Sequence, residues 1–166
     1  MKKTEKDMYL ATFTKFSRAH TSVMNFLSGP PALPEGMTLT QFGVLEVLLH
    51  KGALTHREIA AKILKSRGNL TMVIDHLERD GLVKRLPVAG DRRSMRVALT
   101  PKGEKRIKTV FPLQAEAIRS VFGRLTDQEV ILLGQLCRKL GLSLAAENRT
   151  AKEEGEKPET ASGGAL

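Results

Sequence analysis

Two short helical segments in the middle of the chain constrain the fold more than any other feature. Thr55 is followed three residues later by Glu58, which is the spacing of a capping box, in which each side chain binds a free backbone donor of the other residue. This box opens a short helix over 56–63. Ser66 is placed to cap a second helix, which ends near Gly81, because glycine readily adopts the left-handed conformation of a helix C-cap. The sequence therefore predicts two helices joined by a tight turn.

An alternating segment follows this helix pair. Residues 82–86 (LVKRL) and 95–99 (MRVAL) are predicted to be strands, and residues 88–94 (VAGDRRS) form a polar turn that contains Gly90. A hairpin directly after two helices is a wing. The predicted fold class is mainly α, with a winged helix-turn-helix domain between longer N- and C-terminal helices.

Two further helices precede the capping box. Residues 6–27 carry apolar side chains at steps of three and four, the spacing of one helical stripe. Three prolines between residues 28 and 36 end this helix. The next helix begins at Thr38 or Thr40 and ends near Gly52. The stripe of the first helix consists of Leu10, Phe13, Phe16, Ala19, Val23 and Leu27.

Two helices also follow the wing. A helix over 100–122 begins with a threonine N-cap and a proline at the first helical position, and Pro112 is predicted to kink or interrupt it. A second capping box, Thr126 with Glu129, opens the last helix. The apolar face of that helix consists of Val130, Leu133, Leu136, Cys137, Leu140 and Leu144.

Positive charge is concentrated around the wing. The chain has 27 Lys and Arg against 18 Asp and Glu, a net charge of +9. Residues 51–96 hold 11 basic and 5 acidic side chains, whereas residues 1–50 hold 5 and 4, and residues 97–166 hold 11 and 9. Clustered cations favour a polyanionic partner, and their coincidence with a wing favours double-stranded DNA.

The second helix of the pair can enter the major groove with its N-terminal residues at the base edges. The small Gly68 permits close approach. At the turn of the hairpin, Arg93 can enter a narrow minor groove, where the negative potential is enhanced, and Asp91 can hold it in place by an ion pair. The candidate DNA-binding residues are Arg57, Lys65, Ser66, Arg67, Asn69, Thr71, Met72, Asp91, Arg92 and Arg93.

The stretch 66–81 (SRGNLTMVIDHLERDG), the LVKR that follows it and residues 91–103 (DRRSMRVALTPKG) resemble the MarR family of winged-helix regulators. The string DRRxxxVxLTxxG is a specific signature, and the resemblance extends over about residues 8–144. It implies that the family's wing pair falls on Asp91 and Arg93. Many members carry a basic residue where this chain has Met72. The implied recognition-helix positions are Ser66, Arg67, Asn69, Thr71 and Met72.

The resemblance further implies a homodimer on a pseudo-palindromic operator, with the N- and C-terminal helices of two subunits interlocked. The apolar stripes of those helices, which lack a partner in a small winged module, agree with this. In the family, small phenolic or other apolar effectors bind between the dimerisation helices and the DNA-binding lobe. The function this implies is a ligand- or stress-responsive repressor. Candidate effector-binding residues are Phe13, Phe16, His20, Phe42 and Leu45.

The predicted organisation is an N-terminal dimerisation helix and linker at 1–37, a DNA-binding domain at 38–100, dimerisation helices at 101–147 and a disordered tail at 148–166. Two alternatives remain open. One is a winged module that acts through protein partners, and the other is an architectural DNA-binding protein with little sequence preference. The ratio of specific to random DNA affinity distinguishes them.

Other chemistry has little support in the sequence. The single cysteine, Cys137, allows no intrachain disulfide, and its place on an apolar stripe favours packing over redox sensing. The four histidines lack the spacing of metal ligands, so no metal or other cofactor is expected, and no catalytic motif predicts an enzyme. No signal core or membrane-spanning run is found, so a cytoplasmic protein is expected.

Overall fold

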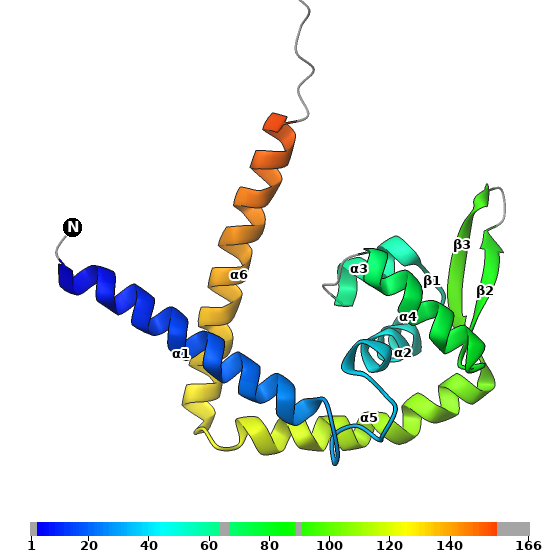
Figure 1. Ribbon diagram of the computed structural model, residues 1–166, viewed down its shortest axis with the longest axis horizontal. Coiled ribbons are helices and arrows are strands. Elements are labelled where there is room, and N and C mark those ends of the chain that lie inside the picture. Colours follow the sequence, from blue (N-terminus) through cyan, green and yellow to red (C-terminus); the bar gives the residue numbers. More distant parts are fainter. Residues whose placement is uncertain (1–2, 64–66, 89–90, 156–166) are drawn as a thin grey trace, which may run out of the picture. The chain divides into compact units, whose positions relative to one another are not determined.

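The computed structural model describes residues 3–63, 67–88 and 91–155, with side chains described at 7–63, 70–87 and 95–144. The chain divides into two compact units, Met1–Val121 and Phe122–Leu166, and each is described by itself. The described elements, in chain order, are α1 (Lys3–Leu27), α2 (Leu39–Lys51), β1 (Leu54–Thr55), α3 (His56–Ile63), α4 (Arg67–Arg79), β2 (Val83–Val88), β3 (Asp91–Leu99), α5 (Pro101–Phe122) and α6 (Asp127–Gly155) (Figure 1).

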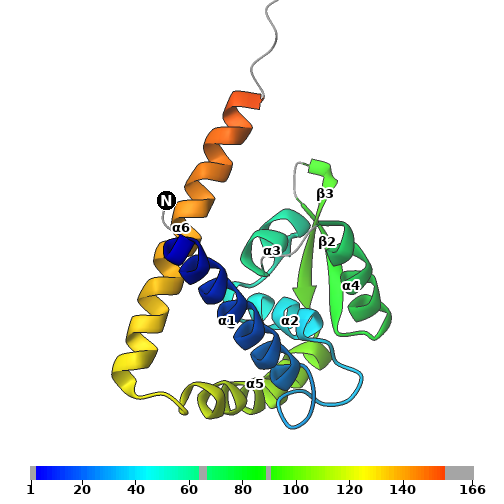
Figure 2. The same cartoon turned by 60° about the vertical axis from the view of Figure 1, so that its left-hand side comes forward.

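A three-stranded antiparallel sheet follows the helix pair, with the strand order β1-β3-β2. β2 and β3 form the hairpin that the sequence predicts as a wing, and α4 lies against β2 (Figure 2). Both strands are longer than predicted, because pairing continues to Val88 opposite Asp91, with an irregularity between Pro87 and Val88. The sequence analysis misses β1, since its two residues are too few to show alternation.

The main core of the first unit joins the winged segment to α5. The inward face of α4, formed by Leu70, Ile74 and Leu77, is buried against α2, α3 and the sheet. Burial of such side chains is the largest favourable term in folding. The other fully buried large side chains of this core are Leu33, Val44, Leu45, Ile59, Val83, Val97, Ile107 and Val110.

The helix caps predicted at Thr55 and Thr126 are present, whereas the cap predicted at Ser66 lies outside the described residues. Thr38 caps α2, and its N–H donates to Gln41 Oε1 at 2.8 Å while the Gln41 N–H donates to Thr38 Oγ1 at 3.2 Å. The Thr55 N–H donates to Glu58 Oε2 at 2.7 Å, and the Glu58 N–H donates to Thr55 Oγ1 at 3.3 Å. The same reciprocal pair occurs in the second unit, where the Thr126 N–H donates to an oxygen of Glu129 at 2.8 Å. Local sequence patterns therefore set these helix starts.

The end of α4 is locked to the start of α5. Gly81 has a φ of +70°, and the Leu82 N–H donates to the Leu77 carbonyl at 2.8 Å, as in a Schellman C-cap. The Thr100 hydroxyl donates to the Gly81 carbonyl at 2.7 Å. A Cβ on Gly103 would lie 1.9 Å from the Leu82 carbonyl oxygen, so only glycine permits this contact. The recognition helix and α5 are thus joined through backbone atoms.

Two expectations about the later helices differ from the structure. α5 runs as one helix through Pro112, with Val110 and Ala117 buried on either side, so the proline does not interrupt it, while the alternative of a kink at this position stays a prediction. α6 continues to Gly155, although disorder is expected from residue 148, since alanine, lysine and glutamate in this stretch are good helix formers. Residues 156–166 lie outside the described part of the chain.

Candidate nucleic-acid interface

The helix pair presents one face of α4 outward. With Leu70, Ile74 and Leu77 buried, the opposite face carries Thr71 and Met72, both exposed. This is the face that enters the major groove in a helix-turn-helix protein. The Thr71 side chain takes part in an interaction within the chain.

The structure describes only some of the predicted DNA contacts in full. Arg57 is exposed on the first turn of α3, close to the start of α4 in the chain. Lys65 and Ser66 lie outside the described residues. Arg67 and Asn69 belong to α4, and Asp91, Arg92 and Arg93 begin β3, but their side chains are not described. The ion pair between Asp91 and Arg93 therefore stays a prediction.

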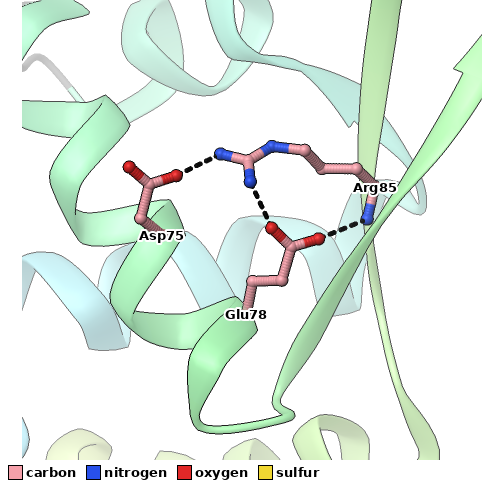
Figure 3. A network of polar contacts seen from close by, with 3 residues as sticks. All are labelled: Asp75, Glu78 and Arg85. Carbon is pink, nitrogen blue, oxygen red and sulfur yellow. Dashed lines mark hydrogen bonds and ion pairs between the residues drawn. The ribbon is translucent and has the colours of Figure 1, made fainter.

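An ion-pair network joins the wing to the recognition helix, and the sequence analysis misses it. The Arg85 guanidinium of β2 donates to both Asp75 and Glu78 of α4 (Figure 3). The Arg85 backbone N–H also donates to Glu78 Oε1 at 3.2 Å. Arg85 is only 27% exposed, so water screens this network less than a surface pair. The hairpin and α4 are therefore held at a defined mutual position.

The network sets the local charge next to the DNA-facing helix. The hydrogen bond to Asp75 is the largest cause of a raised pKa of Arg85, so the arginine remains a cation. Burial lowers the pKa of the nearby His56 from its usual value, and the Arg85 charge lowers it further, although Asp75 opposes both. Without Arg85, the two carboxylates of Asp75 and Glu78 would stand uncompensated on α4. An acidic pair three residues apart on α4 opposite a basic strand is the signal that could have revealed this network.

A cavity of about 940 Å³ lies in the first unit, among α1, α2, α3 and α5. Its wall includes the side chain of Gln114, which is 2% exposed and whose Oε1 has no hydrogen-bond partner. A buried amide oxygen without a partner is costly, and a bound molecule with a donor group would remove that cost. Other polar groups of the wall come from Thr38, Glu46, His50, Lys51 and Lys62.

The predicted effector residues fall in different places. Phe42 lines the cavity. Leu45 is fully buried in the core and is not part of the wall. Phe13, Phe16 and His20 are exposed on α1, away from the wall residues of that helix, which lie at its C-terminal end. Gln114 has no apolar periodicity or motif around it that distinguishes it in the sequence.

The described residues form neither a metal-binding cluster nor a membrane-spanning helix. None of their His, Cys, Asp and Glu side chains gather in groups of three or more that could hold a metal ion. Within the same part of the chain, none of the helices has the length and apolar character needed to cross a bilayer. Cys137 is exposed on α6 in the single chain.

The helix pair, the hairpin and the outward face of α4 define a winged helix-turn-helix protein. Residues 35–94 match the model of the MarR family. The chain is 33% identical to the HTH-type transcriptional regulator MhqR of Bacillus subtilis, over 84% of this chain and 94% of that protein. The chain therefore belongs to the MarR family, and it is a DNA-binding transcriptional regulator.

Two solved structures support the fold. One comes from a study of how 6-hydroxynicotinic acid regulates DNA binding by Bordetella bronchiseptica BpsR, and it matches with a TM-score of 0.72 and 24% identity, over 79% of this chain and 98% of that one. The other is a mutant of Escherichia coli MarR complexed with operator DNA. It matches with a TM-score of 0.71 and 24% identity, over 84% of this chain and 99% of that one.

Proposed function

We propose that the protein is a homodimeric repressor that binds a pseudo-palindromic operator and is released by a small molecule. The proposal rests on the unit formed by α4 and the wing. Arg85 holds these two elements together, and the outer face of α4 is exposed. One such unit covers one half-site, and a symmetric pair covers two half-sites about one helical turn apart.

Within this unit, the first helix braces against the phosphate backbone and the second reads bases. Arg57 at the start of α3, and Lys65 and Ser66 between α3 and α4, are assigned to phosphates as hydrogen-bond donors. Arg92 and Arg93 act at the wing tip, with Arg93 in the minor groove and Asp91 orienting it. The base-reading positions of α4 are Arg67, Asn69, Thr71 and Met72.

Exposed apolar side chains supply the argument for the dimer. Leu10, Phe13 and Phe16 of α1 are exposed, and so is a long row of leucines on α6. Apolar surface of this extent marks an interaction site, and a second copy of the chain offers the matching surface under a two-fold axis. In this proposal Phe13 and Phe16 serve the dimer. The exposed row on one face of α6 consists of Leu133, Leu136, Leu140 and Leu144, and Ile131, Leu132 and Leu142 are exposed on its other sides.

The cavity beside Gln114 supports an effector site. Its size suits a small aromatic or other largely apolar molecule, and Phe42 and Met37 contribute apolar wall. The DNA binding of BpsR, which shares the fold, is regulated by an aromatic acid. An effector that prefers a dimer with a different spacing of recognition helices shifts the population away from the DNA-bound form.

Selection of duplexes from a random pool tests the proposal. The expected result is an inverted repeat, bound far more tightly than random duplex across a salt series. Arg93→Ala should weaken binding at least tenfold, because a minor-groove contact is lost in each half-site, whereas Lys108→Ala on α5 should change little. A specificity ratio near one would instead indicate an architectural protein, and negligible binding would indicate a module that acts through protein partners.

The effector site is tested with 6-hydroxynicotinic acid and with phenol as probes. Binding of either should raise the melting temperature and lower operator affinity of the wild-type protein. Gln114→Leu should retain the fold but lose the response, because the acceptor in the cavity wall is gone. An equal response in Gln114→Leu would contradict this site.

A further inference from the structure

Met72 occupies the most outward position of the recognition helix. Counted around α4, it lies nearly opposite the buried stripe of Leu70, Ile74 and Leu77, and its side chain is 56% exposed. No part of the core accounts for a large apolar side chain at this position. Met72 therefore contributes little to the core, and its side chain is available for contact with a partner.

Met72 lies one helical turn after a glycine. Helical side chains lean toward the N-terminus, over the residue four positions earlier. For Met72 that residue is Gly68, which has no side chain. On the other side, the charge of Asp75 is compensated by Arg85. Neither a side chain at residue 68 nor an uncompensated charge of Asp75 therefore opposes the approach of the thioether to a surface.

Met72 does not belong to the apolar surface assigned to the dimer. That surface consists of rows of residues on α1 and α6, whereas the outward neighbours of Met72, namely Thr71, Asp75 and His76, are polar. Among described side chains of residues 38–100, the large hydrophobics that are exposed are Met72 and Met95, which is 39% exposed on β3. Both lie on the two elements that face DNA in a winged helix.

The major groove presents one apolar group, the C5-methyl of thymine. A methionine cannot pair with phosphate or with a base donor, but its flexible, polarizable thioether packs well on a methyl group. We propose that Met72 is a specificity-determining residue that reads a thymine methyl in each half-site. This inference rests on the proposed binding of α4 in the major groove.

The test starts from the duplex recovered from the random pool. Thymines are replaced by deoxyuridine in symmetric pairs, which removes only the methyl groups. One pair should lower wild-type affinity by about fourfold per half-site, or about fifteenfold for the dimer, the effect of a lost buried methyl. Met72→Ala should bind the thymine duplex more weakly and should be indifferent to uracil at that pair.

Met95→Ala is the matched control, because it removes the other exposed methionine and should keep the uracil sensitivity of the wild-type protein. Met72→Arg should change the selected base at that position from thymine to guanine, since arginine pairs with guanine O6 and N7. Thermal melting of each variant checks the fold. The melting temperature should stay close to that of the wild type, because an exposed position tolerates substitution.

Three results would overturn the inference. In the first, no uracil pair changes the affinity of the wild-type protein. In the second, a uracil pair lowers the affinity of the wild type and of Met72→Ala equally. In the third, the selected half-site contains no thymine. A pool that yields no preferred sequence contradicts the proposed repressor as well, and this is seen before any uracil is introduced. The two failures are therefore distinguishable.

Discussion

The winged region buries its apolar side chains, whereas the flanking helices α1 and α6 leave most of theirs exposed. In the winged region, the core residues of α2, α3 and α4 are buried against one another and the sheet. On α1 and α6, stripes predicted with equal ease remain exposed along most of their length. The same apolar periodicity therefore corresponds to a packed core in the winged region and to an exposed apolar surface on α1 and α6.

The largest effect is expected at the joint between α4 and α5, where Gly103→Ala should destabilise the fold by about 3 kcal/mol or more. The added Cβ would lie 1.9 Å from the Leu82 carbonyl oxygen, so the backbone must move. Urea unfolding measures the loss. Gly43→Ala is the control, because its Cβ meets Ile63 at an ordinary 3.6 Å and helix propensity favours alanine. Equal stability of the two variants would contradict the close contact.

Charged substitutions on the exposed apolar surface of α6 should leave the winged region folded but prevent dimerisation. Leu136→Glu combined with Leu140→Glu should yield monomers and weaken operator binding by about a hundredfold, because the two half-sites are no longer bound together. Sedimentation gives the mass and fluorescence anisotropy gives the affinity. Lys139→Glu changes the net charge by the same amount on the same helix and should keep the dimer. Dimers that persist in the double variant would refute the assignment of this surface.

A smaller effect on operator binding is expected from the ion pairs of Arg85 with Asp75 and Glu78, which clamp the wing to α4. Arg85→Ala should weaken operator binding about tenfold, because α4 loses its charged hydrogen bonds to β2 and two carboxylates are uncovered. Adding Asp75→Asn and Glu78→Gln removes the repulsion but does not restore the clamp, so part of the loss should remain. Lys84→Ala, on the neighbouring exposed residue of β2, is the control. Full recovery in the triple variant would show that charge alone matters.

The smallest effect is expected at the cap of α3. Thr55→Ala should cost about 1 kcal/mol of unfolding free energy at neutral pH, the usual value for a lost N-cap. Bonds from the Thr55 N–H and then its hydroxyl lower the pKa of Glu58. A lowered folded-state pKa means stability that is present above the usual value of 4.5 and is lost as the pH falls through the folded-state value.

The difference between Thr55→Ala and wild type should therefore narrow between pH 7 and pH 3.5. Urea unfolding at the two pH values measures it. Thr109→Ala is the control, because the Thr109 hydroxyl donates only to the Lys105 carbonyl of its own helix, at 3.0 Å. A pH-independent difference at Thr55 would disprove the coupling to Glu58.

Sequence reasoning succeeded where the determinants are local. The caps at Thr38, Thr55 and Thr126 involve residues three positions apart, and the wing turn carries its own polar signal. It missed Arg85 because the ion pairs depend on the register of β2 against α4, which no short window contains. The partnerless oxygen of Gln114 is likewise a property of tertiary packing. Helix propensity outweighed a composition typical of disorder at residues 148–155.

The Glu78 side chain has one more consequence, which concerns self-association of the hairpin. β2 is an edge strand, and free N–H groups along such an edge invite pairing with a strand of another molecule. Glu78 occupies the outward N–H of Arg85, and Pro87, two residues further along the same edge, has none to offer. These two features protect this edge of the hairpin from strand addition by another molecule.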